Sequence, residues 1–361
     1  MAVAVYHTIL YTGLAGTAAL AFPQIFALVR NGFLGVPIFI VLSGFVLMLP
    51  VVRSGAYRLP KGLKNFIFRR FRRIVPPYWV ALILSITLIA LVPVMRVQSG
   101  TQWDNKIPIT TDDVVGHFLL IQNFLGGITK INGPMWSVSI EWQIYFLMPL
   151  MLLPLWRRFG AWFTISVVAA LSLAPSALIA VHELTGRFDV LVPLAKAYAR
   201  QHPWFVLLFA LGMVAAELAG NPEVRAKWLW LPTLVVGAFV YLWADFAQAN
   251  RAVSETLVGV AIALLLVWLA KNTSAATSRL LSSAPLVRLG GMSYSIYLIH
   301  SPLLALGNMI TLPIGLQPGA QLALMYFVVL PLALLASWMF HLLVERHFMT
   351  AHQSELRSAR T

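Results

Sequence analysis

Residues 132–146 (NGPMWSVSIEWQIYF) place a carboxylate and hydroxyl groups inside apolar sequence. The turn signal NGP precedes an apolar helix that carries Ser137 and Glu141 and that is long enough to cross a bilayer. A carboxylate in such a span costs about 2.5–3.5 kcal/mol on insertion scales, so we expect Glu141 to face protein or a water-filled cavity. Glu141 is therefore either a structural partner between two helices or an active-site carboxylate.

A second polar stripe lies in residues 286–306 (LVRLGGMSYSIYLIHSPLLAL). Tyr297 and His300 are three residues apart and share a helix face, as do Ser293 and Tyr297, which are four apart. On a membrane helix this stripe is expected to line the interior of a bundle. It would serve either helix-to-helix hydrogen bonding or a substrate site.

His7 lies in the first apolar stretch, where an ionisable side chain is either a packing residue or a functional one. Residues 32–49 are rich in small side chains that allow helices to approach closely. Packing is the better explanation for Gly44. Ser43 could act as a nucleophile only with a base beside it.

A basic segment, residues 61–79 (KGLKNFIFRRFRRIVPPYW), holds four arginines within five residues. We expect Pro76 and Pro77 to set the start of the following span, where proline is tolerated. The arginines either anchor the chain to lipid headgroups or bind a phosphorylated donor. Coenzyme A would suit the second role, because the planar fork of arginine pairs with phosphate oxygens.

The composition is that of a membrane protein: 60% of the 361 residues are hydrophobic and only 11% are charged. The chain has no cysteine, which excludes disulfides, thiolate metal sites and cysteine nucleophiles. A net charge of +14 would suggest nucleic acid in a soluble protein. Here it is better explained by membrane topology and anionic lipid.

The elements expected to position these side chains form an all-α bundle of about ten membrane spans. The chain is predicted to be one membrane-embedded domain, 1–361, and most of its 26 Lys and Arg residues fall on the side that places both termini in the cytoplasm. No internal repeat supports a repeat-built transporter. The predicted spans are 2–22, 33–52, 75–95, 136–156, 161–181, 203–219, 228–246, 252–270, 287–307 and 321–343.

In order and spacing, these motifs resemble those of the acyltransferase 3 family, the ten-span bacterial membrane O-acyltransferases. The resemblance covers nearly the whole chain. An arginine that the family pattern places upstream of its first-span histidine has no match in this sequence. The matching stretches are His7, Gly35-Val36 with Ser43-Gly44-Phe45, Arg70-x-x-Arg73-Ile74 with Pro76, Asn132-Gly133-Pro134-x-Trp136-Ser137 with Glu141, and Ser293-Tyr294-x-x-Tyr297-Leu298-x-His300.

The resemblance implies transfer of an acyl group, usually acetyl from acetyl-CoA, to a hydroxyl of a cell-surface carbohydrate or glycolipid. It implies a bacterial cytoplasmic membrane, acyl-CoA as donor substrate, no permanently bound cofactor and no metal. His7 matches the family histidine thought to be catalytic, and Arg70 and Arg73 match its paired-arginine motif. The alternatives are a flippase for a lipid-linked glycan and a protein that exports acyl groups for another enzyme.

A mechanistic hypothesis follows from the chemistry of the candidate residues. His7 would be the general base and Glu141 would orient it. Oxyanion donors would come from Tyr294, Ser137 or Asn132. The donor would be held by Arg69, Arg70 and Arg73, and the substrate-binding set would be Asn132, Trp136, Ser137, Ser293, Tyr294, Tyr297 and His300.

Overall fold

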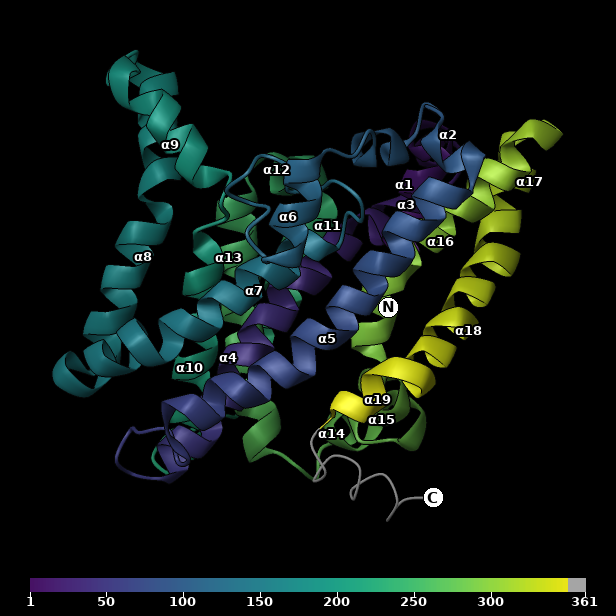
Figure 1. Ribbon diagram of the computed structural model, residues 1–361. Coiled ribbons are helices and arrows are strands. Elements are labelled where there is room, and N and C mark those ends of the chain that lie inside the picture. Colours follow the sequence, from purple (N-terminus) through teal and green to yellow (C-terminus); the bar gives the residue numbers. More distant parts are fainter. Residues whose placement is uncertain (350–361) are drawn as a thin grey trace. The chain divides into compact units, whose positions relative to one another are not determined.

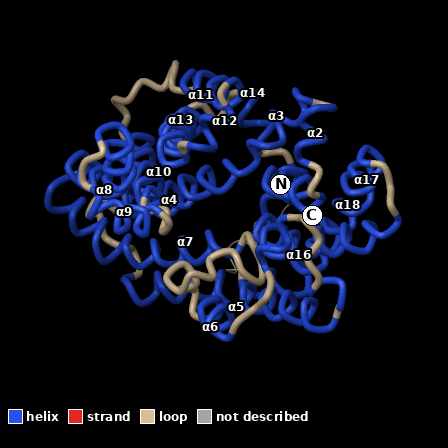
Figure 2. Tube along the Cα trace, turned by 90° about the horizontal axis from the view of Figure 1, so that it is seen from above, coloured by secondary structure: helices blue, strands red, loops and turns tan. Residues whose placement is uncertain are grey.

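The computed structural model describes residues 1–349, and every regular element in that part of the chain is a helix (Figures 1 and 2). The predicted all-α class is therefore confirmed for the described residues. Contacts divide the chain into two compact units. The first unit contains residues 1–33, 65–142 and the chain from Ala284 onward, and the second contains residues 34–64 and 143–283. A single domain over 1–361 remains a prediction.

The first unit begins with three short helices and contains the long helix α5 and the C-terminal helices. Helices η1, α5 and α7 cross the boundaries between the units. Its elements are α1 (Ala2–Thr12), α2 (Ala15–Ala21), α3 (Pro23–Val29), η1 (Arg30–Leu34), α5 (Gly62–Leu91), η2 (Pro93–Arg96), η3 (Gln102–Lys106), α6 (Thr111–Phe118), α7 (Met135–Leu147), α15 (Ala284–Gly291), α16 (Ser293–Thr311), η6 (Leu312–Ile314), α17 (Pro318–Leu324), η7 (Met325–Val329), α18 (Leu330–Phe340), η8 (His341–Glu345) and α19 (Arg346–Phe348).

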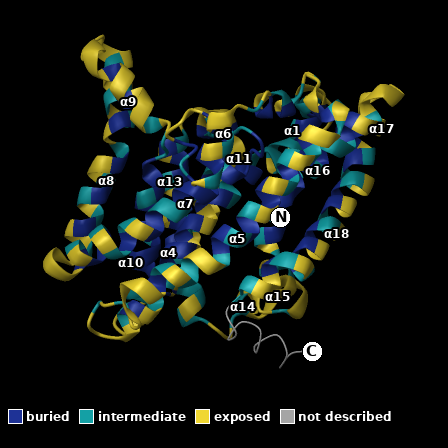
Figure 3. Cartoon of the chain, in the orientation of Figure 1, coloured by how far each residue is buried: buried dark blue, intermediate teal, exposed yellow. Residues whose placement is uncertain are grey.

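The second unit is built around the packing of α4 on α10 and α13. The exposed side chains of α8 include large apolar ones, as lipid-facing helices carry (Figure 3). Its elements are α4 (Gly35–Arg53), η4 (Met148–Leu152), α8 (Leu153–Thr185), η5 (Asp189–Leu191), α9 (Val192–Ala199), α10 (Trp204–Gly220), α11 (Leu231–Leu242), α12 (Ala244–Ala249), α13 (Arg251–Lys271) and α14 (Ala276–Leu281).

The described residues contain 6 helices that are long and apolar enough to cross a membrane, or up to 8 if each of two bent pairs is one span. The expected count of ten is not confirmed. The predicted first span is broken, because α1 and α2 meet at 106° after Gly13, whose left-handed φ of 71° suits glycine. The predicted spans 136–156 and 161–181 lie in one helical run that bends at Gly160, where φ is 84°.

Two further expectations differ from the structure. Helix α5 begins at Gly62, so Pro76 and Pro77 lie inside it, and the expectation that they set the start of a span is not confirmed. Helix α5 therefore includes the whole arginine cluster that precedes the prolines. Helix α11 has 12 residues, whereas a straight span needs about 20. Arg357 and Arg360, which contributed to the topology prediction, lie outside the described residues.

Glycines set the closest helix approach in the second unit. Gly44 of α4 lies against the backbone of Phe209 in α10, and Gly212 of α10 lies against the backbone of Val41 in α4. A side chain at either position would collide with a backbone carbonyl, which cannot move aside alone. Small residues at such crossings let membrane helices pack by van der Waals contact. The packing role expected for Gly44 is confirmed.

We predict that Gly212→Ala destabilises the protein, because the new methyl group must push α4 and α10 apart. Overpacking of this kind costs about 1–3 kcal/mol. The matched control is Gly237→Ala in α11, where an added Cβ meets no heavy atom within 4 Å and alanine favours the helix. Thermal unfolding in detergent measures both variants. Equal melting temperatures for Gly212→Ala and the wild type would contradict this role of the glycine.

Candidate active site

Two histidines from distant parts of the sequence meet in the first unit. His7 Nδ1 of α1 lies 2.9 Å from His300 Nε2 of α16, and the two rings are stacked with centroids 5.1 Å apart. His300 is fully buried and His7 is partly buried. The pair is one of the contacts that hold α1 against α16.

The hydrogen-bond partners determine where the protons lie in this pair. His300 Nδ1 is 2.7 Å from the Ile296 carbonyl, which can only accept, so His300 Nδ1 carries a proton. In a neutral His300, Nε2 is then an acceptor and takes the proton of His7 Nδ1. This leaves His7 Nε2 without a proton and, among the described residues, without a hydrogen-bond partner. His7 Nε2 is therefore free to act as a base.

A second contact joins the same two helices one turn further along. The Tyr11 hydroxyl of α1 hydrogen-bonds the Ser301 hydroxyl of α16, and both side chains are buried. The indole of Trp103, from η3, meets the ring of Tyr11 edge to face at 6.3 Å. These two contacts fix α1 at the level of His7.

Asn132 fixes α16 from its other side. Its Nδ2 donates to the Leu298 carbonyl at 2.7 Å and to Ser85 Oγ at 3.1 Å, so it joins α16 to α5. Its Oδ1 is buried and has no hydrogen-bond donor among the described residues. One turn into α7, Ser137 Oγ lies 2.6 Å from the Tyr297 hydroxyl. The loop before α7 and α7 itself therefore hold the backbone that carries His300.

The remaining predicted site residues differ in their surroundings. Glu141 is buried and lies within electrostatic reach of Tyr297, but the side chain that hydrogen-bonds His7 is His300. The expectation that Glu141 orients His7 is thus not confirmed by the contacts. Ser293 lies at the exposed start of α16 and its Oγ donates to the Gly290 carbonyl, away from the histidines. Trp136 is partly buried at the start of α7.

Tyr294 connects α16 to the arginine cluster. Its hydroxyl donates to the Ile74 carbonyl of α5 at 2.9 Å, and its expected role as an oxyanion donor stays a prediction. Arg69, Arg70 and Arg73 lie on α5 in the turns before Ile74. Tyr294 precedes His300 by six residues, or about 9 Å along α16. The Tyr294 hydrogen bond therefore ties α5, the helix of the arginine cluster, to α16, the helix of His300, about two turns away from His300.

No sequence motif points to Lys106, the last residue of η3. It is only 7% exposed, yet its charge acts on His7. Burial and the nearby Lys130 lower the pKa of the Lys106 ammonium to about 8. In the sequence Lys106 is one charge in a long loop, with no spacing that relates it to His7.

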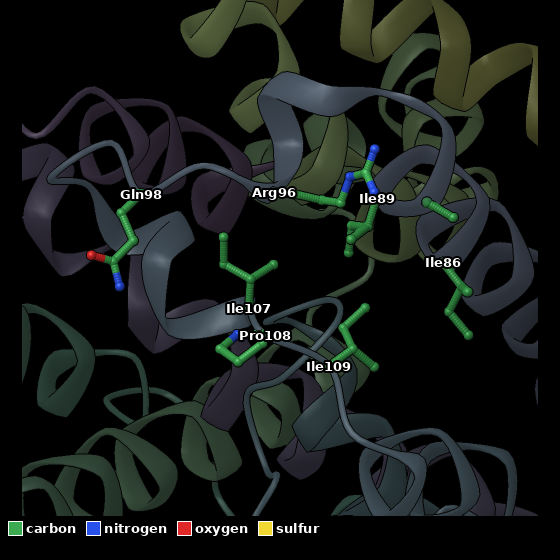
Figure 4. A pocket seen from close by; sticks show the side chains of 8 residues that line it. Ile86, Ile89, Arg96, Gln98, Ile107, Pro108 and Ile109 are labelled. Atoms are coloured by element: carbon green, nitrogen blue, oxygen red, sulfur yellow. The ribbon is translucent and has the colours of Figure 1, made fainter.

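An apolar pocket of about 400 Å³ lies beside the loop that follows Lys106 (Figure 4). Arg96 and Gln98 are the polar side chains on its wall, and the rest of the wall is mainly isoleucine. Such a pocket suits an apolar group attached to a polar one. The lining residues are Ile86, Ile89, Ala90, Arg96, Gln98, Ile107, Pro108 and Ile109.

Comparison with known proteins decides the family. The family model of acyltransferase 3, described as an acyltransferase domain, matches residues 1–342. The chain belongs to the acyltransferase 3 family. Together with its apolar helices, this identifies a multi-pass membrane acyltransferase. No solved structure matches the chain.

Curated relatives of this acyltransferase have the same kind of name. Acyltransferase MdmB of Streptomyces mycarofaciens is 26% identical over 343 residues, which cover 88% of this chain and 81% of MdmB. Peptidoglycan O-acetyltransferase OatA of Listeria monocytogenes is 23% identical over 81% of this chain and 48% of OatA. O-acetyltransferase OatA of Staphylococcus aureus is 26% identical over 77% and 47%. The chain spans about half the length of these OatA proteins.

We predict that Asn132→Asp destabilises the acyltransferase. The substitution keeps the shape of the side chain but replaces the Nδ2 donor by oxygen, which leaves the Leu298 carbonyl unpaired. An unsatisfied buried group costs about 1–3 kcal/mol, and more beside a charge. The control is Asn105→Asp, since Asn105 is exposed and bonds only Gln102 among the described residues. A thermal melt in detergent that shows no difference between the two variants would contradict the bridging role of Asn132.

Proposed function

We propose that this acyltransferase moves an acyl group, such as acetyl, from acyl-CoA to a hydroxyl of a cell-surface carbohydrate or glycolipid. The observation that carries the proposal is the chain of hydrogen bonds from the Ile296 carbonyl through His300 to His7. It leaves His7 Nε2 as a free base. A thioester is already reactive, and the acceptor alcohol is the partner that needs a base.

In the proposed reaction, His7 Nε2 takes the proton of the acceptor hydroxyl as its oxygen attacks the thioester carbon. The new C–O bond forms while the carbonyl electron pair moves to oxygen and gives a tetrahedral oxyanion. The oxyanion then collapses, the C–S bond breaks, and the thiolate takes the proton from the His7 imidazolium. His300 accepts the hydrogen bond of His7 Nδ1 throughout, so the ring stays in its reactive orientation.

Binding of the donor is assigned to Arg69, Arg70 and Arg73, whose guanidinium groups suit the phosphates of coenzyme A. The proposal places this cluster at the cytoplasmic face of a bacterial cytoplasmic membrane, with both termini in the cytoplasm. Tyr294 ties α5, which carries the cluster, to α16, which carries the His300 partner of the base. The name of the Listeria relative supports a carbohydrate acceptor.

We predict that His7→Ala lowers transfer of label from [¹⁴C]acetyl-CoA to membrane acceptors by about 10²–10⁴-fold, the range for loss of a general base. The control is His182→Ala, because the His182 ring lies at the surface near Asp189, in the second unit. Full transfer by His7→Ala would remove His7 from the mechanism. Transfer lost equally in both variants would indicate a general effect on the protein.

We further predict that the double variant Arg70→Gln, Arg73→Gln raises the KM for acetyl-CoA and weakens coenzyme A binding. The physical reason is the loss of charge-assisted hydrogen bonds to phosphate. Arg157→Gln, Arg158→Gln is the matched control, a pair of adjacent arginines on α8. Unaltered donor kinetics in the first variant would leave the cluster as a lipid anchor. A wild-type protein that binds no coenzyme A would favour a flippase.

A further inference from the structure

The most unusual charge in the first unit is that of Lys106. Lys106 is only 7% exposed. Among the described residues its ammonium has no hydrogen bond and no carboxylate partner. Lysine is almost never so buried unless it is paired. In such surroundings a negative group that forms beside the ammonium is stabilised more than it would be in water.

The surroundings of Lys106 include Gly133 and Tyr11. A Cβ built on Gly133 would lie 2.9 Å from Lys106 Cε, 3.2 Å from Lys106 Nζ and 3.4 Å from the Tyr11 hydroxyl oxygen. Lys106 and Tyr11 therefore both lie close to Gly133, and a side chain at residue 133 would displace that of Lys106. Tyr11 is one helical turn from His7, and the Lys106 charge acts on His7 itself.

The acyl-transfer reaction forms a negatively charged oxyanion near His7 and Lys106. When the alcohol gives its proton to His7 Nε2, the thioester oxygen becomes an oxyanion that is bonded to the same carbon as the attacking oxygen. A fixed cation in a site that excludes water stabilises such a charge far more than it would in water. A cation that is unpaired in the resting state does not have to break an ion pair first.

Building on the proposed acyl-CoA-dependent function, we infer that the Lys106 ammonium is the oxyanion-stabilising group of the active site, and that Gly133 allows the Lys106 side chain to lie beside Tyr11. Lys106 donates a hydrogen bond to the oxyanion and keeps its proton throughout. His7 therefore remains the group that takes the proton of the alcohol and returns it to the thiolate. No further reactant is needed.

The test is Lys106→Met, which keeps the linear shape of the side chain and removes the charge. Loss of an oxyanion donor lowers kcat by about 10²–10³-fold, and we expect the KM for acetyl-CoA to stay unchanged because the contact forms only in the transition state. The melting temperature should stay the same or rise, since an unpaired buried charge is removed. The probe is [¹⁴C]acetyl-CoA with native membranes as the acceptor source.

The outcomes separate this inference from the proposed function. A wild-type protein that transfers no label from acetyl-CoA overturns the proposed function, and the inference with it. A variant Lys106→Met with wild-type kcat overturns the inference alone. A fall in melting temperature that accompanies the loss of activity shows a structural lysine and also overturns it. A raised KM with kcat kept shows that Lys106 binds an anionic group of a substrate in the ground state, which overturns it as well.

A chemical rescue tests the charge directly, because the chain has no cysteine of its own. Lys106→Cys should be inactive, and treatment with 2-bromoethylamine should restore activity by forming a near-copy of lysine. Iodoethane, which adds a neutral group, should restore nothing, and treated wild type is the control for the reagents. Equal recovery with both reagents would show that filling the space is sufficient and would overturn the inference.

The pH profile gives a further readout. The groups that face Lys106 are His7 and Tyr11 of α1, His300 of α16 beyond His7, and Lys130 of the loop. Lys106 must be protonated to act, so wild-type kcat should fall as the pH rises through about 8. The residual rate of Lys106→Met should lack this fall, and an identical alkaline fall in the variant would assign it to another group.

Discussion

The structure depends on one constraint: a polar atom within an apolar helix bundle must find a partner in the protein, because no water replaces one that is missing. Helix α16 is the clearest case. Its polar side chains bond to α1 through His300 and Ser301, and to α7 through Tyr297. Its Leu298 carbonyl bonds the loop residue Asn132. The same hydrogen bonds that satisfy α16 thus determine where its neighbours lie.

Within that satisfied network the atoms without partners stand out. Asn132 Oδ1 is one of several buried atoms of the first unit that have no partner. His7 Nε2 and Lys106 Nζ likewise make no hydrogen bond to the described residues, and they are the groups that can act on a substrate as base and cation. His7 owes its free nitrogen to the tautomer that the Ile296 carbonyl imposes through His300. In the proposed reaction, catalytic capacity comes from atoms that the packing leaves unpaired, rather than from unusual residue types.

The sequence predicted much of this region and missed its central pairings. The polar stripe of residues 293–300, the turn at Asn132 and the isolated His7 were visible because polar residues are costly in apolar sequence. The His7–His300 contact was not predictable, because the two residues are separated by nearly the whole chain and no local pattern sets their contact. Local rules also failed at Pro76 and Pro77, which lie inside α5 although proline usually disfavours a helix interior.

Lys106 and Glu345 show how the same constraint yields opposite results. The Glu345 carboxylate is buried and accepts from Ser295 Oγ at 2.6 Å and from the His341 ring at 2.7 Å, so its charge joins α16 to η8. Lys106 is buried to a similar degree and has no such partners. A charge whose partners are built into the fold is already stabilised and gains little from a substrate. An unpaired charge is stabilised only when a negative group arrives, and it therefore lowers the energy of the step in which that group forms.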